Sequence, residues 1–269
     1  MTSFQLPHAR SGADALDVAR RCVLEGGALA LSRFGGRQRF DSKGRGNVVT
    51  DTDIEVERTV HAILRQEFPA HDILSEETAA GTDPHGAWVW VLDPVDGTKN
   101  YSVGIPFWCV TIALLHGGEP VLGVTYDAVR NEQFHATAGG GAFCGDARMS
   151  ASDAPDVESS VISLDLGYDN ALGSSQLAVM GQIFPNVQSM RILGSAALAF
   201  AYAACGRVDM FTHTNVAAWD IAAGMLLVRE AGGVAVNRDG SPMRIDSTMF
   251  AAGGRHVVDD FIRRYLQER

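Results

Sequence analysis

The chain has 269 residues, of which 46% are hydrophobic, so it can bury a sizeable core in one large domain or two tightly packed lobes. Its 22 basic and 32 acidic side chains give a net charge of −10, a balance that argues against binding nucleic acid through phosphate neutralisation. The most hydrophobic stretches, at residues 88–92 and 107–115, fall far short of the roughly 20 residues that a membrane span requires.

The N-terminus and the cysteines indicate the cellular setting. Residues 1–10 contain no apolar run and no small-residue cleavage site, so we expect no secretory signal. The cysteines are far apart and form no C-x-x-C pair, which is typical of reduced, buried thiols: Cys22, Cys109, Cys144 and Cys205. We therefore expect a cytoplasmic protein with no nucleic-acid partner and no membrane partner.

The first half of the chain alternates helical and extended patterns. Residues 16–34 predict a helix that ends at two glycines, and residues 51–68 predict a second helix with Asp51 or Thr52 as its N-cap. Short strands are predicted at residues 48–50, 72–75 and 88–92, the last of which stops at Asp93. From residue 107 to 143, apolar runs separated by glycines predict antiparallel hairpins.

The second half follows a polar stretch at residues 153–156, which we take as the boundary between two lobes (1–152 and 153–269) of a single 269-residue unit. The pattern beyond it predicts strands at 161–164, 191–193, 209–212 and 234–237, and helices at 176–183, 195–205, 218–231 and 259–266. Helices and strands in this mixed order predict an α/β (α+β) fold with layers around a mixed sheet.

Acidic side chains stand at the ends of the predicted apolar elements, where α/β sheets place their ligand sites. They are Glu76, Glu77, Asp93, Asp96 and Asp220. If most of them converge, like charges a few ångströms apart cannot all ionise without cations. Because no Cys or His pair accompanies these oxygen ligands, the pattern favours Mg²⁺ or Mn²⁺ over zinc.

The segment at residues 93–98 is suited to a sharp turn. Pro94 fixes its φ angle and Gly97 relieves steric limits, so both aspartates of the turn can face one metal pair while the Val95 carbonyl adds a ligand. The backbone N–H groups of Gly97 and Thr98 would then cradle an anion. Alone, such a segment would be a surface turn, but the preceding apolar strand and the other acids favour a site.

Segments along the chain resemble, in the same order, the inositol monophosphatase family. They are residues 49–53 (its Val-Thr-x-x-Asp element), 73–77 (its Gly-Glu-Glu element, with Ser75 for glycine), 90–101 with 106–107 (its first signature), 194–198 (its Gly-Ser/Thr-Ala-Ala segment) and 219–233 (its second signature). The resemblance implies a layered αβαβα sandwich and metal-dependent hydrolysis of a phosphomonoester by an activated water.

The resemblance also implies roles for individual residues. Glu76, Asp93 and the Val95 carbonyl would hold one metal ion, Asp93, Asp96 and Asp220 a second, and Glu76 would help to hold a third, which gives two or three Mg²⁺ ions, or Mn²⁺. The catalytic group would comprise Asp53, Thr98 and Glu76, of which the first two orient the attacking water. Substrate contacts would come from Gly97, Thr98, Gly194, Ser195, Ala196, His213 and Asp220, and supporting contacts from Glu77 and Lys43.

Several of these residues have a simpler interpretation. Asp53 could be an acid in a first helical turn, Thr98 an ordinary helix cap and Lys43 a solvated loop charge. His213 stands seven residues before Asp220, where inositol-specific members have an acid. An imidazole cannot accept paired hydroxyl hydrogen bonds as a carboxylate does, which argues against specificity for inositol.

The resemblance leaves the substrate open. Inositol monophosphate is the default small phosphorylated polyol, and histidinol phosphate, fructose 1,6-bisphosphate and 3′-phosphoadenosine 5′-phosphate are alternatives. A different class of function is a non-catalytic interaction protein on the same fold. The family further implies a homodimer and inhibition by Li⁺.

Overall fold

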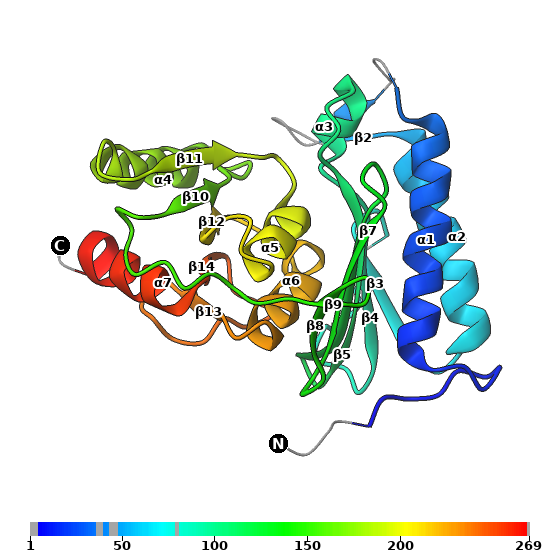
Figure 1. Ribbon diagram of the computed structural model, residues 1–269. Helices are drawn as coiled ribbons and strands as arrows, with labels where there is room; N and C mark the ends of the chain where they lie inside the picture. The colour runs from blue at the N-terminus through cyan, green and yellow to red at the C-terminus, as the bar shows by residue number, and fades with distance from the viewer. Residues whose placement is uncertain (1–4, 36–39, 43–47, 79–80, 268–269) are drawn as a thin grey trace.

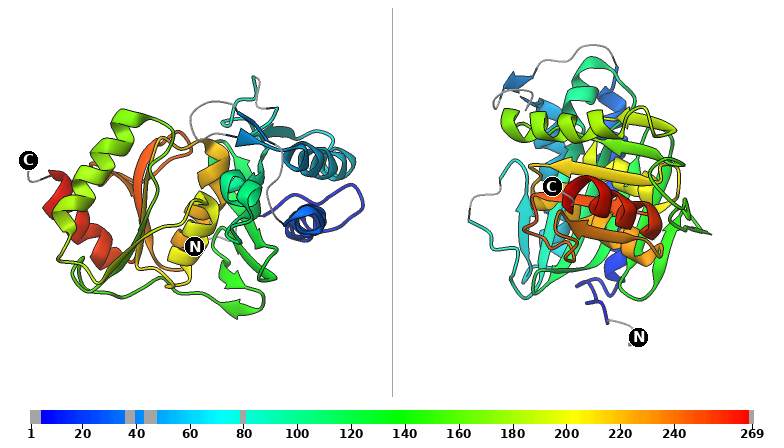
Figure 2. Two further views of the ribbon diagram at one scale, coloured as in Figure 1. Left: turned by 90° about the horizontal axis from the view of Figure 1, so that it is seen from above. Right: turned by 90° about the vertical axis from the view of Figure 1, so that its left-hand side faces the viewer.

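Alternating layers of helices and sheets build the protein, as Figures 1 and 2 show. The computed structural model describes residues 5–35, 40–42, 48–78 and 81–267, and Lys43 lies outside these ranges. From one side to the other, the layers are a helix pair, a seven-stranded sheet, a central helix pair, a five-stranded sheet and an outer helix pair. The three pairs are α1 (Ala15–Arg33) with α2 (Asp51–Glu67), α5 (Ala196–Ala204) with α6 (Ala218–Glu230), and α4 (Asn170–Ile183) with α7 (Arg255–Phe261). The predicted αβαβα sandwich is therefore confirmed.

The seven-stranded sheet follows the chain order. Its strands are β3 (Asp72–Ser75), β4 (Val89–Asp96), β5 (Cys109–His116), β6 (Glu119–Asp127), β7 (Glu132–Thr137), β8 (Gly141–Cys144) and β9 (Ala147–Arg148). β3 and β4 are parallel, and every later pair is antiparallel, which confirms the hairpins predicted from residue 107 onward. A small separate ribbon joins β1 (Asp41–Ser42) to β2 (Val48–Val49).

The five-stranded sheet has the order β11-β10-β12-β14-β13. Its strands are β10 (Val161–Leu164), β11 (Ser189–Ile192), β12 (Met210–Thr214), β13 (Val234–Asn237) and β14 (Met249–Gly253). The first three in this order are parallel, and β14 is antiparallel to both of its neighbours. The chain leaves the first sheet after residue 148 and enters the second at residue 161. The division into two lobes, 1–152 and 153–269, stays a prediction.

The continuous apolar run of β4 reflects helices on both faces of its sheet. Val89 and Val91 belong to the core shared with α5 and α6, whereas Trp90 and Leu92 belong to the core under α1 and α2. A strand covered on both faces needs apolar residues at every position, so its sequence shows no alternation. No helix in the described ranges is long and apolar enough to cross a bilayer.

The structure corrects several predicted boundaries near the site. β4 does not stop at Asp93 but continues to Asp96, because the register against β5 shifts between these two residues and pairing resumes beyond the irregularity. The N-cap of α2 is Thr50, one residue before the predicted candidates, and Asp53 completes a capping box with it. Helix α3 (Thr98–Val103), which the sequence pattern did not predict, begins directly after Gly97.

Other differences lie in the second half of the chain. α4 begins at Asn170, well before the predicted start, because the Asp169 carboxylate caps it by accepting from the backbone N–H groups of Ala171 and Leu172. The predicted C-terminal helix starts earlier, at Arg255, and continues as a π-helix over Ile262–Gln267. Strand β14 was not predicted.

Close packing between the central helices generates a prediction on stability. A Cβ atom at Gly224 in α6 would lie 2.5 Å from the Cβ atom of Phe200 in α5, whose ring is fully buried. Because this core cannot yield easily, we expect Gly224→Ala to lower the free energy of unfolding by about 2 kcal/mol, measured by chemical denaturation. The matched control is Gly181→Ala, since a Cβ atom on that exposed face of α4 meets no described atom within 4 Å. Equal stability of the two variants would contradict the packing argument.

Candidate metal and phosphoester site

Three aspartates converge where β4 ends beside the N-termini of the central helices. Asp93 and Asp96 come from β4, and Asp220 lies in the first turn of α6. One carboxylate oxygen from each can be chosen so that the three atoms lie within 4.8 Å of one another. Two adjoining cavities, each of about 230 Å³, open beside this three-aspartate cluster and share Asp96, Thr98 and Asp220 in their walls.

The start of α5 holds Asp96 in place. The Ser195 hydroxyl donates a hydrogen bond to Asp96, and the backbone N–H groups of Ala196 and Ala197 donate to it at 3.1 and 3.0 Å. Helix N-termini stabilise negative charge through these free N–H groups and the helix dipole. Ser195 and Ala196 also line one of the two cavities, where a substrate contact was expected. In this structure their donor groups are directed to Asp96.

Asp93 and Asp220 have fewer donors than Asp96. The Val95 N–H donates to Asp93 at 3.0 Å, and the Ala217 N–H donates to Asp220 at 2.7 Å. Burial raises the pKa of Asp93 well above its usual range, and repulsion from neighbouring carboxylates, Glu76 first among them, raises it further. Burial and repulsion from Asp96 likewise raise the pKa of Asp220. Among the described residues, no lysine or arginine forms an ion pair with the cluster.

The donor set of the cluster fits a hard divalent cation. Its three ligand atoms are all carboxylate oxygens, the kind that Mg²⁺ and Mn²⁺ prefer, and no histidine or cysteine of the described chain joins the group. Glu76 and Val95 line the same cavity as Asp93 and Asp220. Glu76 is not within the 4.8 Å set, so it shares the cavity without belonging to the cluster.

Asp53 and Thr98 lie side by side at the edge of the cluster. The Thr98 hydroxyl is 3.0 Å from Oδ1 of Asp53 and 2.8 Å from the Val95 carbonyl, so its single proton has two acceptors. The other oxygen of Asp53, Oδ2, accepts from the Thr50 N–H at 2.9 Å and from the Thr50 hydroxyl. The helix-end interpretation and the water-orienting interpretation of Asp53 thus concern different oxygens of one carboxylate.

A tight turn at Gly97 brings the cluster and Thr98 together. Its φ angle is 90°, and a Cβ atom there would lie 3.1 Å from the carbonyl oxygens of Gly194 and Phe107. Only glycine suits this combination of a left-handed backbone and close neighbours. The next segment, α3, begins at Thr98, so Gly97 acts as its N-cap residue.

A hydrogen-bond network holds the turn that carries Glu76 and Glu77. The Ser75 hydroxyl donates to Oε2 of Glu57 at 2.6 Å and lies 3.0 Å from Nε2 of His61. The backbone N–H of Glu77 donates to the same oxygen of Glu57 at 3.0 Å. Glu57 and His61 both come from α2, so this helix fixes the end of β3 as well as Asp53. The sequence pattern did not single out Glu57 or His61.

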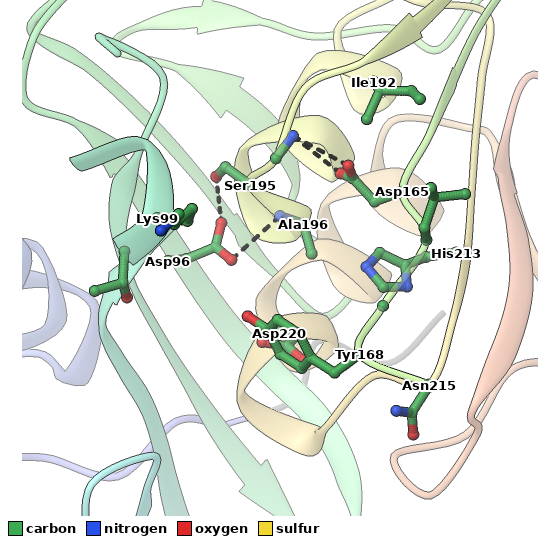
Figure 3. A pocket seen from close by; sticks show the side chains of 15 residues that line it. Asp96, Lys99, Asp165, Tyr168, Ile192, Ser195, Ala196, His213, Asn215 and Asp220 are labelled. Carbon is green, nitrogen blue, oxygen red and sulfur yellow. Dashed lines mark hydrogen bonds between the residues drawn. The ribbon is translucent and has the colours of Figure 1, made fainter. Parts of the chain in front are cut away.

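In the cavity that Ser195 and Ala196 line, residues in or next to the five-stranded sheet form the opposite wall (Figure 3). His213 lies in β12, and Asn215 and Tyr168 are on the adjacent loops. Asp165, which the sequence analysis missed, follows β10 directly and lines the same cavity. The signal that could have found it was present, because Asp165 follows a predicted apolar strand just as Asp93 does.

Repulsion within the cluster generates a prediction on stability without metal. Asp93→Asn keeps an acceptor for the Val95 N–H but removes one charge. Because an acid with a raised pKa destabilises the folded state above the pKa of the unfolded chain, we expect this variant to be more stable than the native protein at pH 8 in EDTA. The gain, measured by urea denaturation, should clearly exceed the effect of removing one exposed charge.

The control for this measurement is Asp153→Asn, which removes one charge from an exposed position. It should change the free energy of unfolding by less than about 0.5 kcal/mol. An Asp93→Asn protein that is less stable than the native one in EDTA would show that repulsion does not govern the cluster.

Comparison with known proteins agrees with this geometry. The sequence model of the inositol monophosphatase family matches residues 13–269. An inositol monophosphatase of Dictyostelium discoideum is 34% identical over 91% of this chain and 93% of its own, and the Nus factor SuhB of Pasteurella multocida is 32% identical over 93% and 94%. The solved IMPase of Thermotoga maritima superposes with a TM-score of 0.85 at 30% identity, covering 92% of this chain and 95% of its own. The chain therefore belongs to the inositol monophosphatase family.

Proposed function

We propose that this protein is a Mg²⁺-dependent phosphomonoesterase that acts on a small phosphorylated alcohol. The observation that carries the proposal is the three-aspartate cluster, whose ligand oxygens lie within 4.8 Å of one another beside the Thr98–Asp53 pair. Membership of the inositol monophosphatase family supports the same chemistry. A carboxylate cluster alone would repel a phosphate ester, so the site needs cations before it can bind this substrate.

The chain supplies the metal ligands from two structural layers. Asp93 and Asp96 of β4 and Asp220 of α6 would hold Mg²⁺, with Glu76 and the Val95 carbonyl in the same cavity as further ligands. When bound, Mg²⁺ would neutralise phosphate charge, acidify a water molecule and stabilise the leaving oxygen. The start of α5 fixes Asp96 through Ser195 and two backbone N–H groups, so this ligand needs little reorganisation.

Thr98 and Asp53 would orient the attacking water. If the Thr98 hydroxyl donates its proton to Oδ1 of Asp53, its oxygen keeps a lone pair that can accept a hydrogen bond from water. Use of the Val95 carbonyl as a metal ligand would leave Asp53 as the acceptor for that proton. The capping box with Thr50 fixes Asp53, which restricts the direction of the Thr98 hydroxyl.

A non-catalytic interaction role is the alternative function, because some relatives are named Nus factors and not phosphatases. One of them is the Nus factor SuhB of Pasteurella multocida, while another is an inositol monophosphatase. A purely interacting protein has no need of buried, mutually repelling carboxylates, which cost stability. The cluster therefore favours catalysis, and inositol monophosphate is the first ester to test.

The proposal predicts how the site responds to single substitutions. We expect Asp96→Asn to abolish Mg²⁺-dependent phosphate release from a panel of phosphomonoesters, because it weakens a central metal ligand.

Thr98→Ala should lower kcat by roughly 100-fold or more, the effect of losing a positioned proton acceptor, while Thr98→Ser retains most activity. Thr59→Ala, which removes a hydroxyl on α2 that donates to the Glu55 carbonyl, is the control.

Circular dichroism would confirm that each variant is folded. Phosphate release by Asp96→Asn at the native rate, or hydrolysis that persists in excess EDTA, would contradict the metal-dependent site. No release from any ester by the native protein would favour the non-catalytic alternative.

Lithium inhibition and a homodimer are further proposals that rest on the family alone. Release of phosphate should fall with increasing LiCl but not with equal NaCl. Light scattering should give twice the mass of the 28.7 kDa chain. Activity that does not change with LiCl would contradict the proposed inhibition. A monomeric mass would contradict the proposed homodimer.

A further inference from the structure

The wall opposite the three-aspartate cluster carries a buried carboxylate with few partners. Asp165 is 7% exposed, and both of its oxygens face one donor, the backbone N–H of Gly194, at 3.1 and 3.2 Å. A carboxylate has about four acceptor positions, so most of its capacity is unused by these contacts. Among the described residues, no lysine or arginine forms an ion pair with Asp165. Burial raises the pKa of Asp165 to about 7, because no nearby cation of the described chain offsets the cost of burying its charge.

His213 adds a second acceptor next to Asp165. The parallel pairing of Leu164 with Thr212 puts the two following residues, Asp165 and His213, side by side on the same face of their strands. Nδ1 of His213 is 2.6 Å from the Thr214 carbonyl, which can only accept, so Nδ1 carries the proton. Burial lowers the pKa of His213 to about 4, so the ring is neutral near pH 7. Nε2 therefore presents a lone pair, and no hydrogen bond between described residues occupies it.

Both acceptors line the cavity beside the three-aspartate cluster. Figure 3 shows the side chains of Asp165 and His213 on one side, with Asp96 across from them. Lys99 also lines this cavity, but it lies on the Asp96 side, with its ammonium 4.4 Å from the centre of the Phe40 ring. The far wall thus offers a buried carboxyl group and a neutral imidazole as acceptors to the group that an esterified phosphate would carry.

We propose that this wall binds an ammonium group, so that the preferred ligand is the phosphate ester of a small amino alcohol. The inference rests on the proposed phosphomonoesterase function, because it needs the phosphate at the three-aspartate cluster. An ammonium group donates to Asp165 and to Nε2 of His213 and brings the charge that the buried carboxylate lacks. A hydroxyl group can also donate to these acceptors, but it leaves the carboxylate without a counter-charge.

A binding experiment with non-hydrolysable ligands tests this inference directly. In the presence of Mg²⁺, calorimetry compares aminoalkyl phosphonates of two to four carbons with hydroxyalkyl phosphonates of the same lengths. At one chain length or more, the ammonium ligand should bind at least about tenfold more tightly, as expected for a hydrogen bond to a charged partner. N-acetylation, which removes the charge, should abolish this preference.

Variants locate the preference on the wall. Asp165→Asn, close in shape but uncharged, should reduce the preference for the ammonium ligand to less than about threefold. Asp153→Asn, which removes an exposed charge from the same half of the chain, should retain it. Equal affinity for both ligand series, or a full preference in Asp165→Asn, would overturn the inference.

Hydrolysis measured in parallel separates the two proposals. If amino and hydroxy phosphate esters are hydrolysed with equal kcat/KM and their phosphonates bind equally, the phosphomonoesterase stands and the ammonium wall fails. If the ammonium phosphonates bind preferentially but no ester is hydrolysed, the wall is supported and the proposed catalytic function fails.

Discussion

Mutual repulsion between Asp93, Asp96 and Asp220 is the constraint around which this end of the molecule is arranged, because buried like charges destabilise the folded chain unless nearby groups offset them. The chain offsets part of the repulsion with helix N-termini. Asp96 accepts from the start of α5, Asp220 lies in the first turn of α6, and Asp53 lies in the first turn of α2. The remaining repulsion would be relieved by a bound cation, which favours the metal site proposed here.

Close packing in the central layer allows the helix ends to reach the strand ends. A Cβ atom at Gly123 of β6 would lie 2.8 Å from the Cα atom of Ala223. The backbone of α6 therefore packs directly against the backbone of the first sheet. α5 is mostly alanine and is buried along almost its whole length. Bulkier residues would push the central helices away from one sheet or the other, and the acids on β4 and α6 would separate.

The sequence was informative where a local pattern coincides with a structural requirement. β4 was predictable because both of its faces are buried, and Gly97 because its turn needs a positive φ angle. Strand β14 was not, since Met249–Gly253 is short, rich in small residues and fixed by pairing with strands far away in sequence. Asp165 follows a predicted apolar strand, as Asp93 does, but its contact with Gly194 joins residues 29 positions apart, and no local pattern predicts that contact.

The two sheets contribute differently to the site, and this division bears on specificity. Asp93 and Asp96 come from β4, Asp220 from α6 and Thr98 from the start of α3, whereas the opposite wall comes from the second sheet. There, Asp165 directly follows β10 and His213 lies in the neighbouring strand β12. Under the proposed function, a change at Asp165 or His213 would therefore alter the group recognised beside the phosphate without moving a proposed metal ligand. His213 illustrates this independence, because the sequence analysis noted that it stands where inositol-specific members have an acid, while Asp165 lies beside it directly after β10. The carboxylate of this wall therefore comes from Asp165, at the end of β10, and His213 of β12 contributes a neutral imidazole.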